Sequence, residues 1–177
     1  MSEVLGILKV RNCVEKKEYM GRMLALDKKH IPDLQELQET VCGVLDRPDI
    51  FVKLSRREWE VILGEDGMVI GLEINGRIWG FSGLLYPGRR EDNLGLDIGL
   101  KEEELFSVAH LETVAVHPCF RGNDLARKTG YLLLEAAQKR KGWKYLLNTV
   151  SPFNYPSIRS TLSMNMRIIA IAEKYGT

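Results

Sequence analysis

The pattern of hydrophobic and polar positions changes from a helical to a strand-like period at Met68. The segment MVIGLEINGRIWGFSGLLY, from Met68 to Tyr86, contains two runs rich in β-forming residues. Asn75-Gly76 joins the two runs, and both positions of such a pair favour the positive φ of a two-residue hairpin turn. The pattern therefore predicts a β-hairpin in the middle of the chain.

One strand and three helices are predicted before this hairpin. Apolar residues recur at a spacing of three and four residues in the first two predicted helices, and Pro48 ends the second helix. Ser55 and Glu58 have the spacing of a capping box, which predicts the start of a third, short helix. The predicted strand is Val4 to Val10, and the helices are Glu15 to Leu26, Pro32 to Pro48 and Ser55 to Leu63.

Strands and helices are predicted to alternate after the hairpin and a polar connection from Pro87 to Glu104, whose KEEEL is expected to form a solvated helical turn. The strands are Val108 to Val116, Tyr145 to Val150 and Arg167 to Ala172, and the helices are Leu125 to Lys141 and Ser157 to Met164. A hairpin followed by a β-α-β unit indicates an α/β (α+β) fold with a mixed sheet and helices on both of its faces.

Length and composition indicate an ordinary globular protein. A chain of 177 residues predicts a single domain over residues 1–177. The net charge of +1 gives no overall field that would attract nucleic acid or an acidic membrane. The sequence shows no run of about 18 apolar residues and no secretory signal. The three cysteines lie far apart and His30 and His117 have no ligand-spaced partners, so we expect a cytoplasmic protein without a metal.

The stretch VAVHPCFRGNDLARKTG, from Val114 to Gly130, has the most distinctive chemistry. It is predicted to run from a strand through a turn into a helix, and the free N–H groups of a helix N-terminus favour a phosphate. Asp124 opposes this interpretation, because it places a carboxylate where an anion would bind. The same aspartate is a favourable residue at a helix start, so the stretch fits either a phosphate cradle or a simple helix cap.

Two segments of the chain resemble the GNAT superfamily, the GCN-related N-acetyltransferases. They are LETVAVHPCFRGNDLARK, from Leu111 to Lys128, and LLNTVSPFNYPS, from Leu146 to Ser157. The resemblance implies a mostly antiparallel sheet of about six strands and acetyl-CoA as co-substrate. It also implies that the strand backbone at Val114, Ala115 and Val116 pairs with the pantetheine of the cofactor and that Asn154 contacts the cofactor. The turn that would bind the pyrophosphate consists of Arg121, Gly122, Asn123, Asp124, Leu125 and Ala126.

The chemistry of acyl transfer adds candidate catalytic residues. An alkylammonium must lose a proton before it attacks, and relatives commonly place a base at the position of His110 or Glu112, which lie two apart on one strand. A backbone N–H near Val114 is expected to hold the oxyanion. Many relatives protonate the leaving thiolate with a tyrosine, but Thr161 occupies that position here.

The sequence therefore predicts an N-acetyltransferase that transfers acetyl by direct attack in a ternary complex. The acceptor is expected to be a small-molecule or peptide primary amine. Asp124, Thr161 and the short C-terminal tail leave open a non-catalytic acyl-CoA-binding regulatory module. A nucleotide-binding module is a weaker alternative, because the chain has no Gly-x-x-x-x-Gly-Lys-Ser/Thr motif. Since only one predicted strand follows Met166, we expect either a trimmed or shortened tail or a partner chain that completes the sheet edge in a homodimer.

Overall fold

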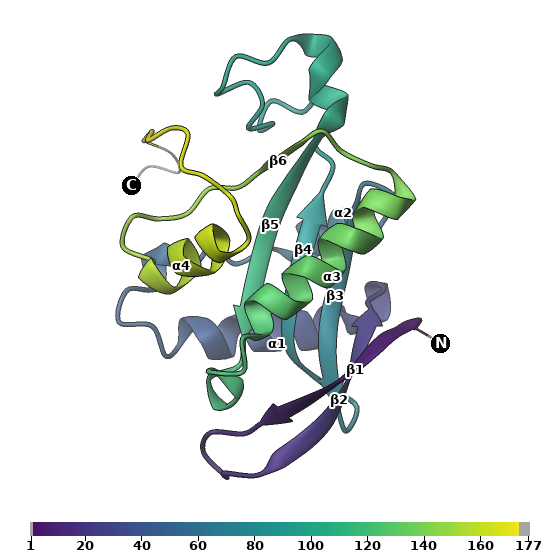
Figure 1. The fold of residues 1–177 in the computed structure, drawn as a ribbon, viewed down its shortest axis with the longest axis vertical. Helices are drawn as coiled ribbons and strands as arrows, with labels where there is room; N and C mark the ends of the chain where they lie inside the picture. The colour runs from purple at the N-terminus through teal and green to yellow at the C-terminus, as the bar shows by residue number, and fades with distance from the viewer. Residues whose placement is uncertain (1, 174–177) are drawn as a thin grey trace.

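The computed structural model, which describes residues 2–173, contains a six-stranded sheet whose spatial order follows the chain (Figure 1). The first five strands pair antiparallel, and the last pairs parallel with the fifth. This sheet confirms the predicted mixed, mostly antiparallel α/β fold. The strands are β1 (Val4–Arg11), β2 (Glu18–Ala25), β3 (Gly67–Ile74), β4 (Arg77–Leu85), β5 (Val108–Val116) and β6 (Tyr145–Leu147).

Helices cover both faces of the sheet, and the sheet separates the hydrophobic core into two clusters. α1 (Ile31–Cys42) and α2 (Arg56–Ile62) pack on one face, around the fully buried Trp59 and Phe81. α3 (Leu125–Arg140) packs on the other face against Leu72, Leu84 and their neighbours. α4 (Tyr155–Ser163) lies beside the N-terminal part of α3 (Figure 1). Four short 3-10 helices complete the elements: η1 (Lys28–His30), η2 (Pro48–Ile50), η3 (Glu102–Ser107) and η4 (Pro118–Phe120).

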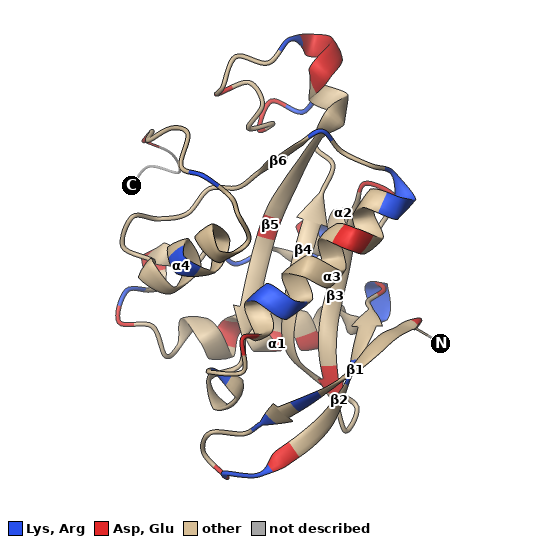
Figure 2. Cartoon of the chain, in the orientation of Figure 1, with Lys and Arg blue, Asp and Glu red and all other residues tan. Residues whose placement is uncertain are grey.

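Local turn and cap signals are confirmed. Asn75 and Gly76 both have positive φ, at 52° and 81°, as the hairpin requires. Ser55 and Glu58 form the predicted capping box at the start of α2. α3 ends in a group of basic residues, visible as blue ribbon in Figure 2, which suits the negative end of its dipole.

The predicted helix from Glu15 to Leu26 is wrong, because Glu18–Ala25 form the strand β2. The apolar residues of this segment satisfy a helical and a strand period about equally well. Pairing with β1 on one side and β3 on the other decides the outcome. Met23 is buried in the sheet, whereas the side chain of Met20 is 63% exposed.

The predicted strands at the C-terminal end also differ from the structure. The strand expected at Tyr145 to Val150 ends at Leu147, because the chain then leaves β5. The strand expected at Arg167 to Ala172 is wrong, because these residues form neither a strand nor a helix and are exposed. Its β-forming residues meet no sheet edge within residues 2–173, so no ladder of hydrogen bonds forms.

Candidate active site

β5 and β6, the last two strands of the sheet, separate after a short stretch of pairing. Their parallel pairing covers only Val108 to His110, after which β5 continues to Val116 while the chain from β6 turns towards α4 (Figure 1). The His117 N–H donates to the Trp79 carbonyl at 2.9 Å, on the β4 side. Because successive residues of a strand direct their amides to opposite sides, Val116 and Val114 present theirs to the side that β6 has left. An extended ligand can pair with the backbone of β5 at this edge.

A β-bulge lies at Glu112, beside this opening. Gly83 of β4 pairs with Thr113 and the next residue, Leu84, pairs with Leu111, so Glu112 is the extra residue. The bulge changes which face the side chains of β5 occupy: Leu111 packs on the α3 side, and Ala115 packs on the α1 and α2 side. Bulges are common next to active sites because they redirect a side chain.

His110 and Glu112, the two predicted candidate bases, contact each other. His110 is only 4% exposed, and its Nδ1 lies 3.5 Å from Oε2 of Glu112, a side chain that is 30% exposed. Nε2 of His110 accepts from the Leu94 N–H at 3.1 Å. Since Nε2 accepts this hydrogen bond, the proton of the neutral ring lies on Nδ1, the nitrogen nearer Glu112. Glu112 is therefore the partner that reaches solvent.

A buried asparagine builds the loop that supplies the Leu94 N–H. Asn93 is 1% exposed; its side chain donates to the Gly88 and Leu105 carbonyls and accepts from the Gly95 N–H. From the sequence, this segment is predicted only as a polar connection. The Asn-x-Gly spacing is a turn signal, but the sequence does not show that the turn packs on His110.

Two charged residues of the same loop lie close to this pair. The hydrogen bond to Arg90 lowers the pKa of Asp92, with further contributions from the charges of Arg90 and His110, while burial opposes the shift. The same hydrogen bond is the main cause of the raised pKa of Arg90, to which the charge of Glu112 also contributes. A basic and an acidic group thus flank the approach to Glu112.

Two residues of the turn from Arg121 to Ala126 have left-handed backbone conformations. Gly122 and Asp124 have φ of 82° and 59°, and α3 begins directly after Asp124. The Asp124 side chain does not cap the helix; its Oδ2 accepts from Nε of Arg127 at 2.6 Å. The first turn of α3 therefore keeps N–H groups that no side chain caps, and the carboxylate is partly neutralised.

Asn123 is used structurally in this turn. Its Oδ1 accepts from the Arg11 N–H at 2.8 Å, and its Nδ2 donates to the Arg11 and Phe120 carbonyls at 2.8 and 2.9 Å. The side chain thus joins the end of β1 to the turn. Leu125 is buried beneath it at 2% exposure, so both residues can contribute to a ligand site mainly through their backbone.

Asn154 and Thr161 lie on α4, across the opening from β5. Asn154 begins the helix, and its Oδ1 accepts from the Ser157 N–H at 3.2 Å. The Thr161 hydroxyl accepts from the Asn148 side chain at 3.3 Å. The Asn154 bond caps the first turn of α4, and the Thr161 bond joins α4 to the chain that leaves β6.

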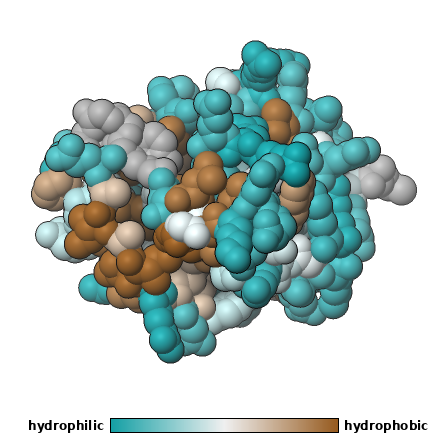
Figure 3. Space-filling view, turned by 90° about the horizontal axis from the view of Figure 1, so that it is seen from above, coloured by the Kyte–Doolittle hydropathy of each residue, from teal (hydrophilic) through white to brown (hydrophobic). Residues whose placement is uncertain are grey.

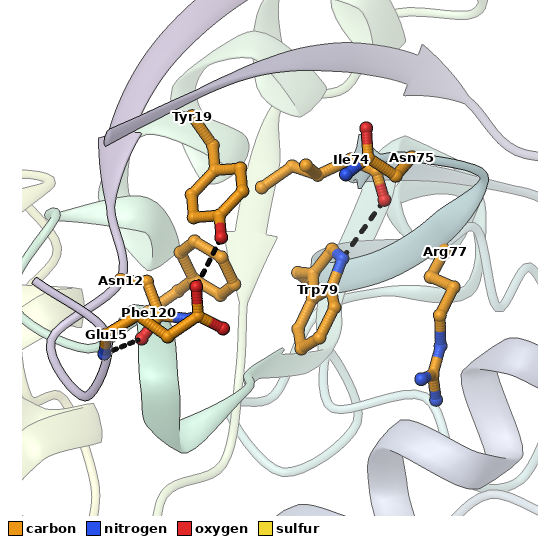
Figure 4. Close-up of a pocket in the computed structure, with 8 residues that line it drawn as sticks. All are labelled: Asn12, Glu15, Tyr19, Ile74, Asn75, Arg77, Trp79 and Phe120. Atoms are coloured by element: carbon orange, nitrogen blue, oxygen red, sulfur yellow. Dashed lines mark hydrogen bonds between the residues drawn. The ribbon is translucent and has the colours of Figure 1, made fainter. Parts of the chain in front are cut away.

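Two pockets formed by the described residues lie beyond the Val116 end of β5, away from His110 and Glu112. One pocket of about 200 Å³ is shown in Figure 4 and is lined by Asn12, Glu15, Tyr19, Ile74, Asn75, Arg77, Trp79 and Phe120. The Tyr19 hydroxyl donates to the Glu15 carboxylate, and this bond raises the pKa of Tyr19. The Trp79 Nε1 donates to the Ile74 carbonyl at 3.2 Å. The predicted site is thus the open edge of β5, and this pocket is a separate feature.

Among residues 2–173, no three His, Cys, Asp or Glu side chains are grouped as metal ligands. In the same part of the chain, none of the helices has the length and apolar character needed to cross a membrane.

The family comparison matches residues 32–160 to the acetyltransferase (GNAT) family, which is more than two thirds of the chain. No curated protein matches the sequence.

Several solved structures share the fold at low sequence identity. The GNAT domain of S. lividans PAT aligns with a TM-score of 0.66 and 15% identity, covering 96% of this chain and 91% of that domain. The ribosomal-protein-S18-alanine N-acetyltransferase from Escherichia coli aligns with a TM-score of 0.64 and 18% identity, covering 88% and 83%. An aminoglycoside N-acetyltransferase in complex with CoA aligns with a TM-score of 0.58 and 15% identity, covering 87% and 96%.

Proposed function

The chain belongs to the acetyltransferase (GNAT) family, and we propose that it transfers acetyl from acetyl-CoA to a primary amine by direct attack in a ternary complex. One observation carries the proposal. The open edge of β5 places an uncapped helix N-terminus at one end and, at a bulge within the strand, a carboxylate with a buried histidine behind it. The first feature suits a diphosphate and the second suits proton removal from an amine.

The backbone of the chain would hold acetyl-CoA, which supplies the acetyl thioester. The N–H groups from Gly122 to Ala126 would bind the pyrophosphate, since the Arg121 N–H already donates to the Pro118 carbonyl at 3.2 Å. Gly122 and Asp124 have positive φ in this turn. The Val116 N–H and the Val114 carbonyl would pair with the pantetheine amides, which leaves the Val114 N–H for the oxyanion. Asn154, at the start of α4, would face the same opening from its other side.

Glu112 would act as the base. Its carboxylate accepts a proton from the attacking amine, directly or through one water, as the new C–N bond forms. The Val114 N–H, directed to the open edge, would stabilise the oxyanion of the tetrahedral intermediate. The C–S bond then breaks and the leaving thiolate takes a proton, either from water or from a hydroxyl. His110 would hold the Glu112 carboxylate in place through Nδ1 and would not itself contact the amine.

The acceptor would be a small-molecule or peptide amine that approaches from the face of the sheet covered by α1 and α2. His110 lies on that face, because cross-strand partners share a face and its partner Leu85 packs there. Two structural neighbours are named for aminoglycoside and ribosomal-protein-alanine acetylation, which supports an amine acceptor without choosing between these classes.

The alternative is an acyl-CoA-binding regulatory module. Thr161, which occupies the position of the usual tyrosine and is already hydrogen-bonded, favours this alternative. Calorimetric titration with acetyl-CoA tests both functions, because both require saturable binding. A thiol-release assay over a panel of amines then separates them. Turnover that is lost in Glu112→Gln while binding persists supports the enzyme; binding without turnover of any amine supports the module.

A further inference from the structure

The pocket of about 200 Å³ beyond the end of β5 has aromatic walls. Trp79 and Tyr19 both pack edge to face against Phe120, with ring centroids 5.1 and 6.0 Å from it. Hydrogen bonds hold the two outer rings, from the Trp79 Nε1 to the Ile74 carbonyl at 3.2 Å and from the Tyr19 hydroxyl to Glu15. The rings are therefore fixed in place by the protein itself.

Glu15 places a negative charge among these rings. Its carboxylate lies beside the Tyr19 hydroxyl, on the side of the cavity opposite Trp79 (Figure 4). Arg77 lies on the far side of the Trp79 ring, with its guanidinium 5.5 Å from the ring centroid, and is paired with Glu36. The face of Trp79 directed towards Glu15 thus carries no cation of the protein.

A buried amide has an unused donor in the same pocket. Asn12 is 5% exposed and lines the cavity. Its Oδ1 accepts from the Val14 and Glu15 N–H groups at 2.9 and 3.0 Å, which fixes the orientation of the amide. Within residues 2–173, no protein group accepts a hydrogen bond from its Nδ2. A polar group this buried normally has a partner, so Nδ2 is available to an oxygen of a ligand.

The charges around the pocket favour a cation. A second pocket of about 180 Å³ shares part of its lining with the first and adds the carboxylates of Asp33 and Glu36. Together with Glu15, these carboxylates outnumber the guanidinium of Arg77. His117 also lines the second pocket, but burial lowers its pKa, so it adds no positive charge at neutral pH.

We propose that this pocket binds a small methylated ammonium ligand that carries a hydroxyl or carbonyl oxygen close to the cation. The cation lies between the free face of Trp79 and the Glu15 carboxylate, where the ring quadrupole and the negative charge both attract it. Its methyl groups fill the space between the aromatic rings, and its oxygen accepts from Nδ2 of Asn12. A methylated cation suits such walls because it is large and weakly hydrated.

The site is separate from the open edge of β5, so the proposal does not depend on acetyl transfer. The pocket lies at the lower end of the molecule in Figure 1, where the β1–β2 connection, the β3–β4 turn and η4 meet. Figure 3 looks onto the opposite end, where apolar surface gathers on the side of α4 and takes no part in this site.

Choline is the probe, because it combines a quaternary ammonium with a hydroxyl and has no N–H that could be acetylated. Calorimetric titration compares it with its neutral analogue, in which a tert-butyl group replaces the trimethylammonium group. We expect saturable choline binding that is about tenfold or more tighter than that of the analogue. Tetramethylammonium, which lacks the oxygen, should bind about two- to tenfold more weakly than choline.

Glu15→Gln tests the charge, because glutamine keeps the shape and can still accept from Tyr19. This variant should bind choline about three- to tenfold more weakly and should bind the neutral analogue as the native chain does. Glu103→Gln, which removes an exposed carboxylate outside the pocket, is the matched control and should bind choline normally. In NMR spectra, choline should shift the indole N–H signal of Trp79 more than those of Trp59 and Trp143.

Several outcomes would overturn the proposal. Choline could show no saturable binding, or the neutral analogue could bind as tightly as choline. Glu15→Gln could retain the native affinity, which would remove the carboxylate from the site. A choline response confined to Trp59 or Trp143 would place the binding elsewhere in the molecule.

Discussion

Nδ1 of His110 lies 3.5 Å from Oε2 of Glu112, while Nε2 of the same ring accepts the Leu94 N–H at 3.1 Å. The backbone of the loop thus fixes the ring, and Nδ1 faces the carboxylate. This arrangement assigns different roles to the two residues.

Glu112→Gln should lower kcat by about 10²- to 10⁴-fold, because it removes the base while keeping the shape of the side chain. The Kd for acetyl-CoA should stay within about twofold, since the carboxylate does not contact the diphosphate. Steady-state thiol release and calorimetry measure the two quantities. An unchanged kcat would show that Glu112 is not the base.

His110→Ala should lower kcat less than Glu112→Gln does, because the base remains but loses the ring that positions it. His110→Asn, whose amide can still donate to Glu112, is the matched control and should retain more of the native kcat. Steady-state thiol release measures kcat for both variants. Equal losses in the two variants would show that His110 serves only to fold the loop around Asn93.

Asp124→Gly should tighten coenzyme A binding by about two- to tenfold. The change removes a negative charge from the turn, although the ion pair with Arg127 already reduces the repulsion. Asp124→Asn separates charge from geometry, because asparagine also tolerates the φ of 59°. Both variants should bind more tightly in calorimetric titration, and looser binding by either would contradict the proposed repulsion.

Asn123→Ala should lower the free energy of unfolding by about 1–3 kcal/mol, because it leaves the Arg11 and Phe120 backbone groups without their partner. Asn123→Asp keeps the acceptor for the Arg11 N–H but loses both donors, so it should fall between the native chain and the alanine variant. Urea unfolding measures the difference. Equal stability of all three chains would mean that the link between β1 and the turn is not stabilising.

The stability of the protein should fall as the pH drops below about 6.5, in part because of His117. Burial lowers the pKa of His117, and the charges of Arg77 and Arg121 add to the effect. The unfolded chain therefore binds a proton at a higher pH than the folded chain does. The contribution of His117 is present above the unfolded pKa and is lost as the pH falls towards the folded one.

Nδ1 of His117 accepts from the Cys119 N–H at 3.2 Å, so protonation also removes this cap of η4. His117→Asn keeps an acceptor that does not titrate. Thermal unfolding midpoints measured between pH 7.5 and 5 should fall less in this variant, and parallel curves would contradict the prediction.

The sequence by itself determined the elements whose signals are local. The Asn75-Gly76 turn, the Ser55 and Glu58 cap and the strand from Val108 to Val116 form as predicted, because each depends on neighbours within a few residues. The family resemblance came from such a contiguous stretch, and the family match agrees with it.

Only the tertiary structure decided the features that depend on distant partners. Glu18–Ala25 form a strand because β1 and β3 lie on either side, and Arg167 to Ala172 do not, because they meet no edge within residues 2–173. The prediction missed the strand β2 and added a strand at Arg167 to Ala172. The predicted sheet therefore had the observed number of strands although one of them was wrong. The bulge at Glu112 and the loop behind His110 arise from pairing and packing between segments far apart in the chain, which periodicity along one segment does not encode.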